Sequence, residues 1–139
     1  MTGPVRPGIL LAGALVLACV MSGCAPSATT PVENYPGTPN DAGEVELDDG
    51  GFGGAWLDDG ASFGVTVSGS STCPPIGSGY AVTGGNAITV TLETIPADKA
   101  CTADFGPHTT VFRAASELES DQDLTVTVNT ETFTIPALP

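Results

Sequence analysis

Residues 62–67 read SFGVTV and residues 88–92 read ITVTL, so an apolar side chain occupies every second position in both stretches. Because successive side chains of a strand point to opposite faces, this alternation places one face on a core and the other in water. Residues 124–128 (LTVTV), 132–135 (TFTI) and 44–48 (EVELD) repeat the pattern. All five stretches predict half-buried β-strands.

Weaker strand signals lie at 54–57, 79–83 and 109–114, and Gly-, Pro- and Asp-rich turns separate the stretches. The pair Asp59-Gly60 has the composition of a hairpin turn. Seven or eight short strands in about 95 residues predict an all-β fold, a small antiparallel β-sandwich of immunoglobulin-like architecture. A small barrel is the alternative that the sequence leaves open.

The expected core consists of the apolar members of these stretches and the single tryptophan of the chain. These residues are Trp56, Phe63, Val65, Val67, Ile88, Val90, Leu92, Val126, Val128 and Phe133. Apolar residues make up 41% of the 139 positions. That content supports one small folded domain and is too high for wholesale disorder.

The chain is strongly acidic, with 16 Asp and Glu residues against 3 Lys and Arg residues and a formal net charge of −13. A protein that binds nucleic acid by neutralising phosphates needs clustered Lys and Arg. The composition therefore excludes that class of nucleic-acid binder.

The first 23 residues have the layout of an export signal. Residues 9–21 (ILLAGALVLACVM) carry no charge and follow Arg6. These thirteen residues are too few to cross a bilayer core, which needs about 20 in a helix. Their length is typical of the apolar region of a signal peptide.

The segment Met21-Ser22-Gly23-Cys24 resembles the lipobox of bacterial lipoprotein precursors, although Met21 stands where leucine is usual. The resemblance implies that the Cys24 thiol receives a diacylglycerol and that cleavage occurs before Cys24. It also implies that acyl chains such as palmitate hold the mature lipoprotein on the extracytoplasmic face of the cell membrane, since two or more chains give stable anchoring. Acylation of Cys19, or an ordinary secretory cleavage, is the alternative.

Residues 24–43 are rich in Pro, Thr, Ser, Gly and Asn and show no apolar periodicity. This composition predicts a disordered tether. The expected organisation is a signal peptide over 1–23, a tether over 24–43 and a β-sandwich domain over 44–139. Tyr35 is the one aromatic residue of the tether, and we expect it to be solvated.

Two cysteines remain if Cys19 is removed and Cys24 is acylated. The exported side of a membrane permits disulfides, so we predict a structural bond between Cys73 and Cys101. A redox role would require a Cys-x-x-Cys spacing or a thiolate-stabilising neighbour. A zinc site would have only these two cysteines and one histidine as ligands. The sequence favours the structural bond over both.

The stretch Ser71-Thr72-Cys73-Pro74-Pro75, together with residues 100–104 (ACTAD), resembles small β-rich lipoproteins of high-GC Gram-positive bacteria. The resemblance extends over residues 55–135 and rests on few positions. It implies export and β structure, and it implies no site residue.

His108 is the only histidine of the chain. A Ser/His/Asp triad could be drawn with Asp104, but no G-x-S-x-G nucleophile elbow is present. A general base also needs positioned partners. Residues 107–109 read as a loop entering a strand, so we expect His108 to be solvated and not catalytic.

Two Asp-Asp-Gly turns, at 48–50 and 58–60, repeat at an interval of ten residues. Paired carboxylates on adjacent turns could hold Ca²⁺, which takes six to eight oxygen ligands. Their spacing is not that of an EF-hand loop, and Asp-Gly is common hairpin chemistry. The sequence therefore favours turns with a solubilising surface over a cation site.

The sequence predicts a non-enzymatic binding or interaction module at the cell envelope, with the membrane and an envelope protein as partners. We expect no cofactor, no metal site and no catalytic residue. One alternative is a cation- or small-solute-binding accessory lipoprotein that uses Asp48, Asp49, Asp58 and Asp59. The other is an envelope hydrolase that uses His108 or paired carboxylates.

Overall fold

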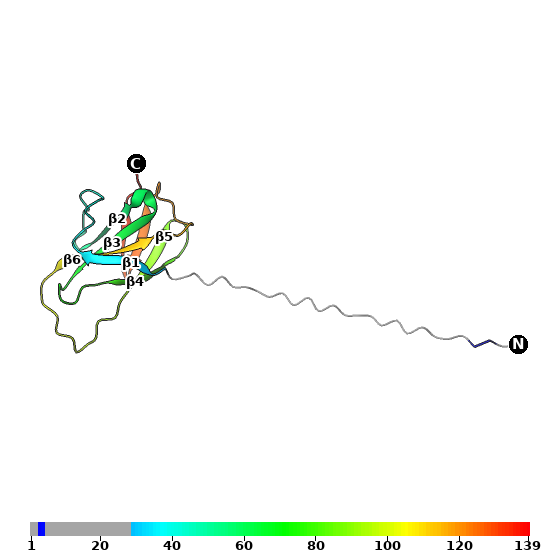
Figure 1. The fold of residues 1–139 in the computed structure, drawn as a ribbon, viewed down its shortest axis with the longest axis horizontal. Coiled ribbons are helices and arrows are strands. Elements are labelled where there is room, and N and C mark those ends of the chain that lie inside the picture. Colours follow the sequence, from blue (N-terminus) through cyan, green and yellow to red (C-terminus); the bar gives the residue numbers. More distant parts are fainter. Residues whose placement is uncertain (1–2, 5–28) are drawn as a thin grey trace.

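Eight β-strands and one short 3-10 helix form the regular structure of residues 3–4 and 29–139, the part of the chain that the computed structural model describes (Figure 1). The strands are β1 (Pro31–Pro36), β2 (Phe52–Leu57), β3 (Ser62–Gly69), β4 (Gly77–Val82), β5 (Ala87–Leu92), β6 (Gly106–Arg113), β7 (Leu124–Val128) and β8 (Glu131–Ile135). The helix η1 (Asp58–Gly60) joins β2 to β3 at the expected hairpin. The predicted signal peptide over 1–23, Cys19 and Cys24 fall outside this description, apart from residues 3–4.

The strands form two four-stranded sheets, ordered β1-β6-β3-β2 and β4-β5-β7-β8. Their inner faces share one core cluster, which confirms the predicted all-β sandwich. Along β7 and β8, the apolar side chains are buried while Thr125, Thr132 and Thr134 are exposed, as alternation requires. Period-two patterning therefore decides which side of the second sheet faces the core.

Nine of the ten expected core residues are buried, and Leu92 is half-buried. The core also contains two aromatic rings outside that prediction, Tyr80 and Phe112, which are 1% and 0% exposed. Both pack on Phe63, with ring centroids 5.1 Å and 5.7 Å away. The centre of the sandwich is therefore an aromatic cluster with contributions from both sheets.

The first sheet is antiparallel throughout, as predicted, but β5 and β7 pair in parallel. Parallel neighbours cannot be joined by a hairpin and need a crossover connection. The chain leaves β5 for β6 in the opposite sheet before it returns to β7. The second sheet is therefore mixed.

The prediction of a disordered tether over 24–43 is wrong for residues 31–36, which form β1 and pair with β6. Thr29 already pairs with Tyr80 of β4 through two backbone hydrogen bonds of 2.9 Å and 3.2 Å. Two prolines are tolerated in β1 because it is an edge strand. Tyr35 is half-buried on this strand rather than solvated. The sandwich therefore begins before the expected boundary at residue 44.

The expected strand over 44–48 is also wrong, since these residues make no sheet pairing. They lie against β2, where a side chain at Gly53 would come within 2.7 Å of the Glu46 carbonyl and 2.8 Å of the Leu47 side chain. Val45 and Leu47 are half-buried while Glu44 and Glu46 are exposed. The alternation thus reflects packing on a strand and not membership of a sheet.

The disulfide between Cys73 and Cys101 is present, with a Cα–Cα distance of 5.5 Å. It joins the loop after β3 to the loop before β6. Within residues 3–4 and 29–139, no helix is long and apolar enough to cross a membrane.

The Tyr80 hydroxyl ties the second sheet to the end of β6 in the first. It donates to the Arg113 carbonyl at 2.6 Å and accepts from the Ala115 N–H at 2.8 Å. We expect Tyr80→Phe to lower the unfolding free energy in urea by about 1–3 kcal/mol, because two backbone groups lose their partner. The control is Tyr35→Phe. The Tyr35 hydroxyl has no hydrogen bond among the described residues, so its removal should change the unfolding free energy little. Equal effects of the two changes would contradict this role.

Candidate functional site

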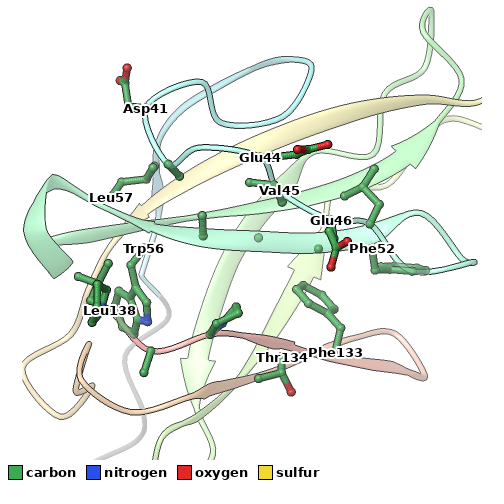
Figure 2. Close-up of a pocket in the computed structure, with 18 of the residues that line it drawn as sticks. Asp41, Glu44, Val45, Glu46, Phe52, Trp56, Leu57, Phe133, Thr134 and Leu138 are labelled. Carbon is green, nitrogen blue, oxygen red and sulfur yellow. The ribbon is translucent and has the colours of Figure 1, made fainter.

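A groove of about 1070 Å³ opens where the two sheets end side by side. β2 is the last strand of the first sheet and β8 the last strand of the second. Figure 2 shows β2 crossing the view, with the segment of Asp41–Glu46 on one side and Phe133, Thr134 and Leu138 on the other. We call this feature the β2–β8 groove.

Apolar side chains from distant segments form the floor of the groove. The rings of Phe52 on β2 and Phe133 on β8 lie 6.2 Å apart and bridge the two sheets. Val45, Leu47 and Leu138 add aliphatic surface. The groove thus offers apolar contact along its length.

The absence of a side chain at Gly54 allows β2 and β8 to approach each other. A Cβ atom there would lie 2.4 Å from the Gly64 carbonyl and 2.7 Å from the Ile135 side chain. Any larger residue at position 54 would force β2 away from its neighbours. Gly54 therefore sets the shape of the groove.

Trp56 lies in the same wall and is only 4% exposed. Its indole Nε1–H is buried without a hydrogen-bond partner among the described residues. A buried tryptophan N–H usually finds an acceptor, and leaving it unmet costs about 1–3 kcal/mol. The groove wall therefore contains a donor that lacks an acceptor.

The rim of the groove is acidic. Its lining contains six exposed carboxylates: Asp41, Glu44, Glu46, Asp48, Asp58 and Asp59. No lysine, arginine or histidine is among the described residues that line it. A ligand at this rim therefore meets negative charge only.

On β2, the backbone N–H and C=O groups of every second residue point away from β3. The Ser68 N–H donates to the Gly51 carbonyl, and the Asp48 N–H donates to the Phe52 carbonyl, both at 2.9 Å. In an antiparallel pair the direction of these groups alternates residue by residue. Gly53 and Ala55 therefore bond to β3, while the amide and carbonyl groups of Gly54 and Trp56 point outward at the edge that borders the groove.

Two of the predicted acidic residues serve turns. Asp48 Oδ1 accepts from the N–H groups of Gly50 and Phe52 at 2.9 Å each, and an Asp58 carboxylate oxygen accepts from the Ser62 hydroxyl. Within the described part of the chain, no three His, Cys, Asp or Glu side chains are grouped so as to hold a metal ion. Asp48, Asp49, Asp58 and Asp59 are thus not assembled into the alternative cation site.

The expectation of a solvated His108 is wrong, because the side chain is 7% exposed on β6. Its Nε2 lies 2.8 Å from Asn34 Oδ1 on β1, and burial lowers its pKa. Asp104 belongs to another cluster, where hydrogen bonds from Ser71 and Thr102 lower its pKa to about 2. The structure therefore does not bring His108 and Asp104 together as two members of a triad.

The lowered pKa of His108 predicts a dependence of stability on pH. The folded state binds the proton more weakly than the unfolded state, whose histidine pKa is about 6.5. The unfolding free energy should therefore fall as the pH drops below that value. Urea melts between pH 7.5 and 5.5 should show a smaller fall for His108→Gln than for the unmodified chain. Parallel curves would show that His108 does not contribute.

No family model, curated protein or solved structure matches this chain. The sequence and the β2–β8 groove are therefore the grounds for a function.

Sequence reasoning identified the acidic turns and Trp56 but not the groove that they border. Phe133 was expected only in the core, and Leu138 was not singled out. Phe133 and Leu138 come close to β2 because β2 and β8 end the two sheets on the same side. No local sequence pattern indicates that contact.

Proposed function

We propose that the chain is a non-enzymatic, lipid-anchored binding module of the cell envelope that takes its partner into the β2–β8 groove. The observation that carries this proposal is the groove itself, with its apolar floor, acidic rim and buried tryptophan donor. Concave sites of this kind, apolar with a few directed polar groups, are where proteins usually bind ligands.

The lipobox resemblance at 21–24 supports the anchor, and the position of the sandwich adds a geometric constraint. Thr29, which pairs with Tyr80, follows Cys24 by five residues. Five residues span at most about 18 Å. An acylated Cys24 would therefore hold the sandwich close to the bilayer surface and not at the end of a tether of twenty residues.

The surroundings of the titratable groups support a non-catalytic role. His108 is paired with Asn34 away from the groove, and Asp104 is bound by Ser71 and Thr102. A catalytic acid or base needs positioned reactive partners, and neither group has them in these contacts.

Site-directed photo-crosslinking in intact cells tests the binding role. A photoreactive amino acid at Thr134, inside the groove, should yield a defined covalent adduct. The same amino acid at Thr83, an exposed residue outside the groove lining, is the matched control and should not. The same adducts from both positions, or none from Thr134, would refute the proposal.

Intact-mass spectrometry of the membrane fraction tests the anchor. The product should lack residues 1–23 and be heavier than its amino acids by the mass of the acyl groups. Cys24→Ser should abolish both changes, whereas Cys19→Ser should leave them. Loss of the modification in the Cys19 variant alone would reassign the acylated residue.

A further inference from the structure

We propose that the partner in the β2–β8 groove is an extended peptide segment carrying lysine or arginine, which adds as a new strand to the open edge of β2. This inference rests on the proposed function and specifies the chemistry of the partner.

The β2 edge provides the main-chain part of the recognition. The outward amide and carbonyl groups of Gly54 and Trp56 have the spacing that an antiparallel or parallel strand pairs with. A strand edge without a pairing partner is a template for another chain, and peptides bind many domains in this way. Gly54 and Trp56 are buried in the free chain, so this edge lacks a partner strand but is not freely exposed. The outward groups of Phe52 are already bonded to Asp48, so the part of β2 without an outer partner runs over the five residues 53–57, about 17 Å of strand.

The groove has room for the side chains of such a strand. Its volume of about 1070 Å³ is slightly above the range for small-molecule sites, about 300–1,000 Å³. Side chains of an added strand alternate between two directions. One set would contact the apolar floor at Phe52 and Phe133, and the other would lie at the acidic rim.

Charge determines which peptide fits. The rim has six carboxylates, and the described lining has no basic residue. This charge attracts a cationic peptide segment and repels an acidic one. The carboxylates also disfavour a second copy of this chain, whose formal net charge is −13. Complementarity of charge thus points to lysine or arginine on the rim-facing side of the partner.

Trp56 gives independent support for an occupant with carbonyl groups. Its Nε1–H is a buried donor without an acceptor, and a peptide backbone presents a carbonyl at every residue. Because the Nε1 atom has almost no exposed surface in the free chain, a peptide carbonyl would satisfy it only if the groove wall moved as the peptide bound. Because Trp56 is the only tryptophan of the chain, its single indole N–H resonance reports directly on the groove.

The test is an NMR titration of the ¹⁵N-labelled full-length chain with a blocked octapeptide of alternating valine and lysine. We expect shifts of the Trp56 indole and of the Gly54 amide, and no shifts with the same peptide carrying glutamate in place of lysine. Two N-methylated forms of the lysine peptide serve as a pair with equal charge. One lacks the N–H groups of its valine residues and the other lacks those of its lysine residues. Only one of them should lose binding, because only one set of amides faces β2.

Two double variants distinguish the effect of the rim carboxylates on peptide affinity from the effect of the overall negative charge of the chain. Glu44→Gln with Glu46→Gln should weaken binding by about threefold to tenfold, as expected for two exposed charge pairs. Glu93→Gln with Asp98→Asn removes two exposed charges outside the groove lining and should leave the affinity unchanged.

Four results would overturn the inference. They are no shift with the lysine peptide, equal behaviour of the two N-methylated forms, equal shifts with lysine amide alone, and indole shifts that depend on protein concentration without peptide. The last two would indicate a small cation and a second copy, respectively. If crosslinking from Thr134 still succeeded, the binding role would stand while the peptide chemistry failed.

Discussion

Phe63→Ala should destabilise the domain by about 3–5 kcal/mol, the cost of emptying a buried aromatic site. Phe63 has no exposed surface, and its ring packs on Trp56, Tyr80 and Phe112 at centroid distances of 5.1–5.7 Å. A domain of this size has a total stability of about 5–15 kcal/mol, so the variant should lose a large share of it. Urea unfolding measures the loss.

The matched control is Phe105→Ala, because Phe105 is 67% exposed. Its replacement removes the same atoms from a loop and should change the unfolding free energy by less than about 0.5 kcal/mol. Similar losses from the two variants would show that the aromatic cluster around Phe63 is not the core.

Reducing the disulfide should lower the unfolding free energy by about 3.5 kcal/mol on the chain-entropy account of loop closure. The bond joins residues separated by 28 positions and encloses β4 and β5. Urea unfolding with and without a thiol reductant measures the difference. The expectation rests on the length of the enclosed loop.

The double variant Cys73→Ala with Cys101→Ala separates the bond from side effects of the reductant. It should unfold like the reduced chain and should not respond to reductant. An oxidised chain no more stable than this variant would mean that the bond does not stabilise the domain.

The sandwich could be predicted because β3, β5, β7 and β8 carry a strict alternation of apolar and polar residues. β1 could not, since its sequence, PVENYP, has two prolines and no such pattern. It pairs antiparallel with β6, with a register shift between Pro31 and Glu33, and this non-local partner is not visible in the sequence of β1. The error on His108 has the same origin, because its partner Asn34 lies 74 positions away in the segment expected to be a tether.

The groove could be predicted only in part. The acidic turns and the hairpin at Asp59-Gly60 are local features, so the sequence indicates them. The groove itself needs β2 and β8 to end the two sheets on the same side, which depends on the order of all eight strands. That order is set by packing across the sandwich and not by any one segment.

The early start of the sandwich, at Thr29 and β1, shortens the expected spacer between the anchor and the folded domain. Under the proposed acylation, the chain has only the residues between Cys24 and Thr29 as a spacer. Thr29 joins the sandwich at the edge formed by β1 and β4, whereas β2 and β8 end the two sheets at the other edge, so the groove lies on the side away from the anchor.

Amide hydrogen exchange along β2, followed by NMR, tests the central claim that an open strand edge borders the groove. Amides without a hydrogen-bond partner open at low free energy, whereas ladder amides exchange through larger unfolding events. We predict fast exchange at Gly54 and Trp56 and strong protection at Gly53 and Ala55 in the free chain. Equal protection at all four amides would show that the β2 edge is already paired and would contradict the account.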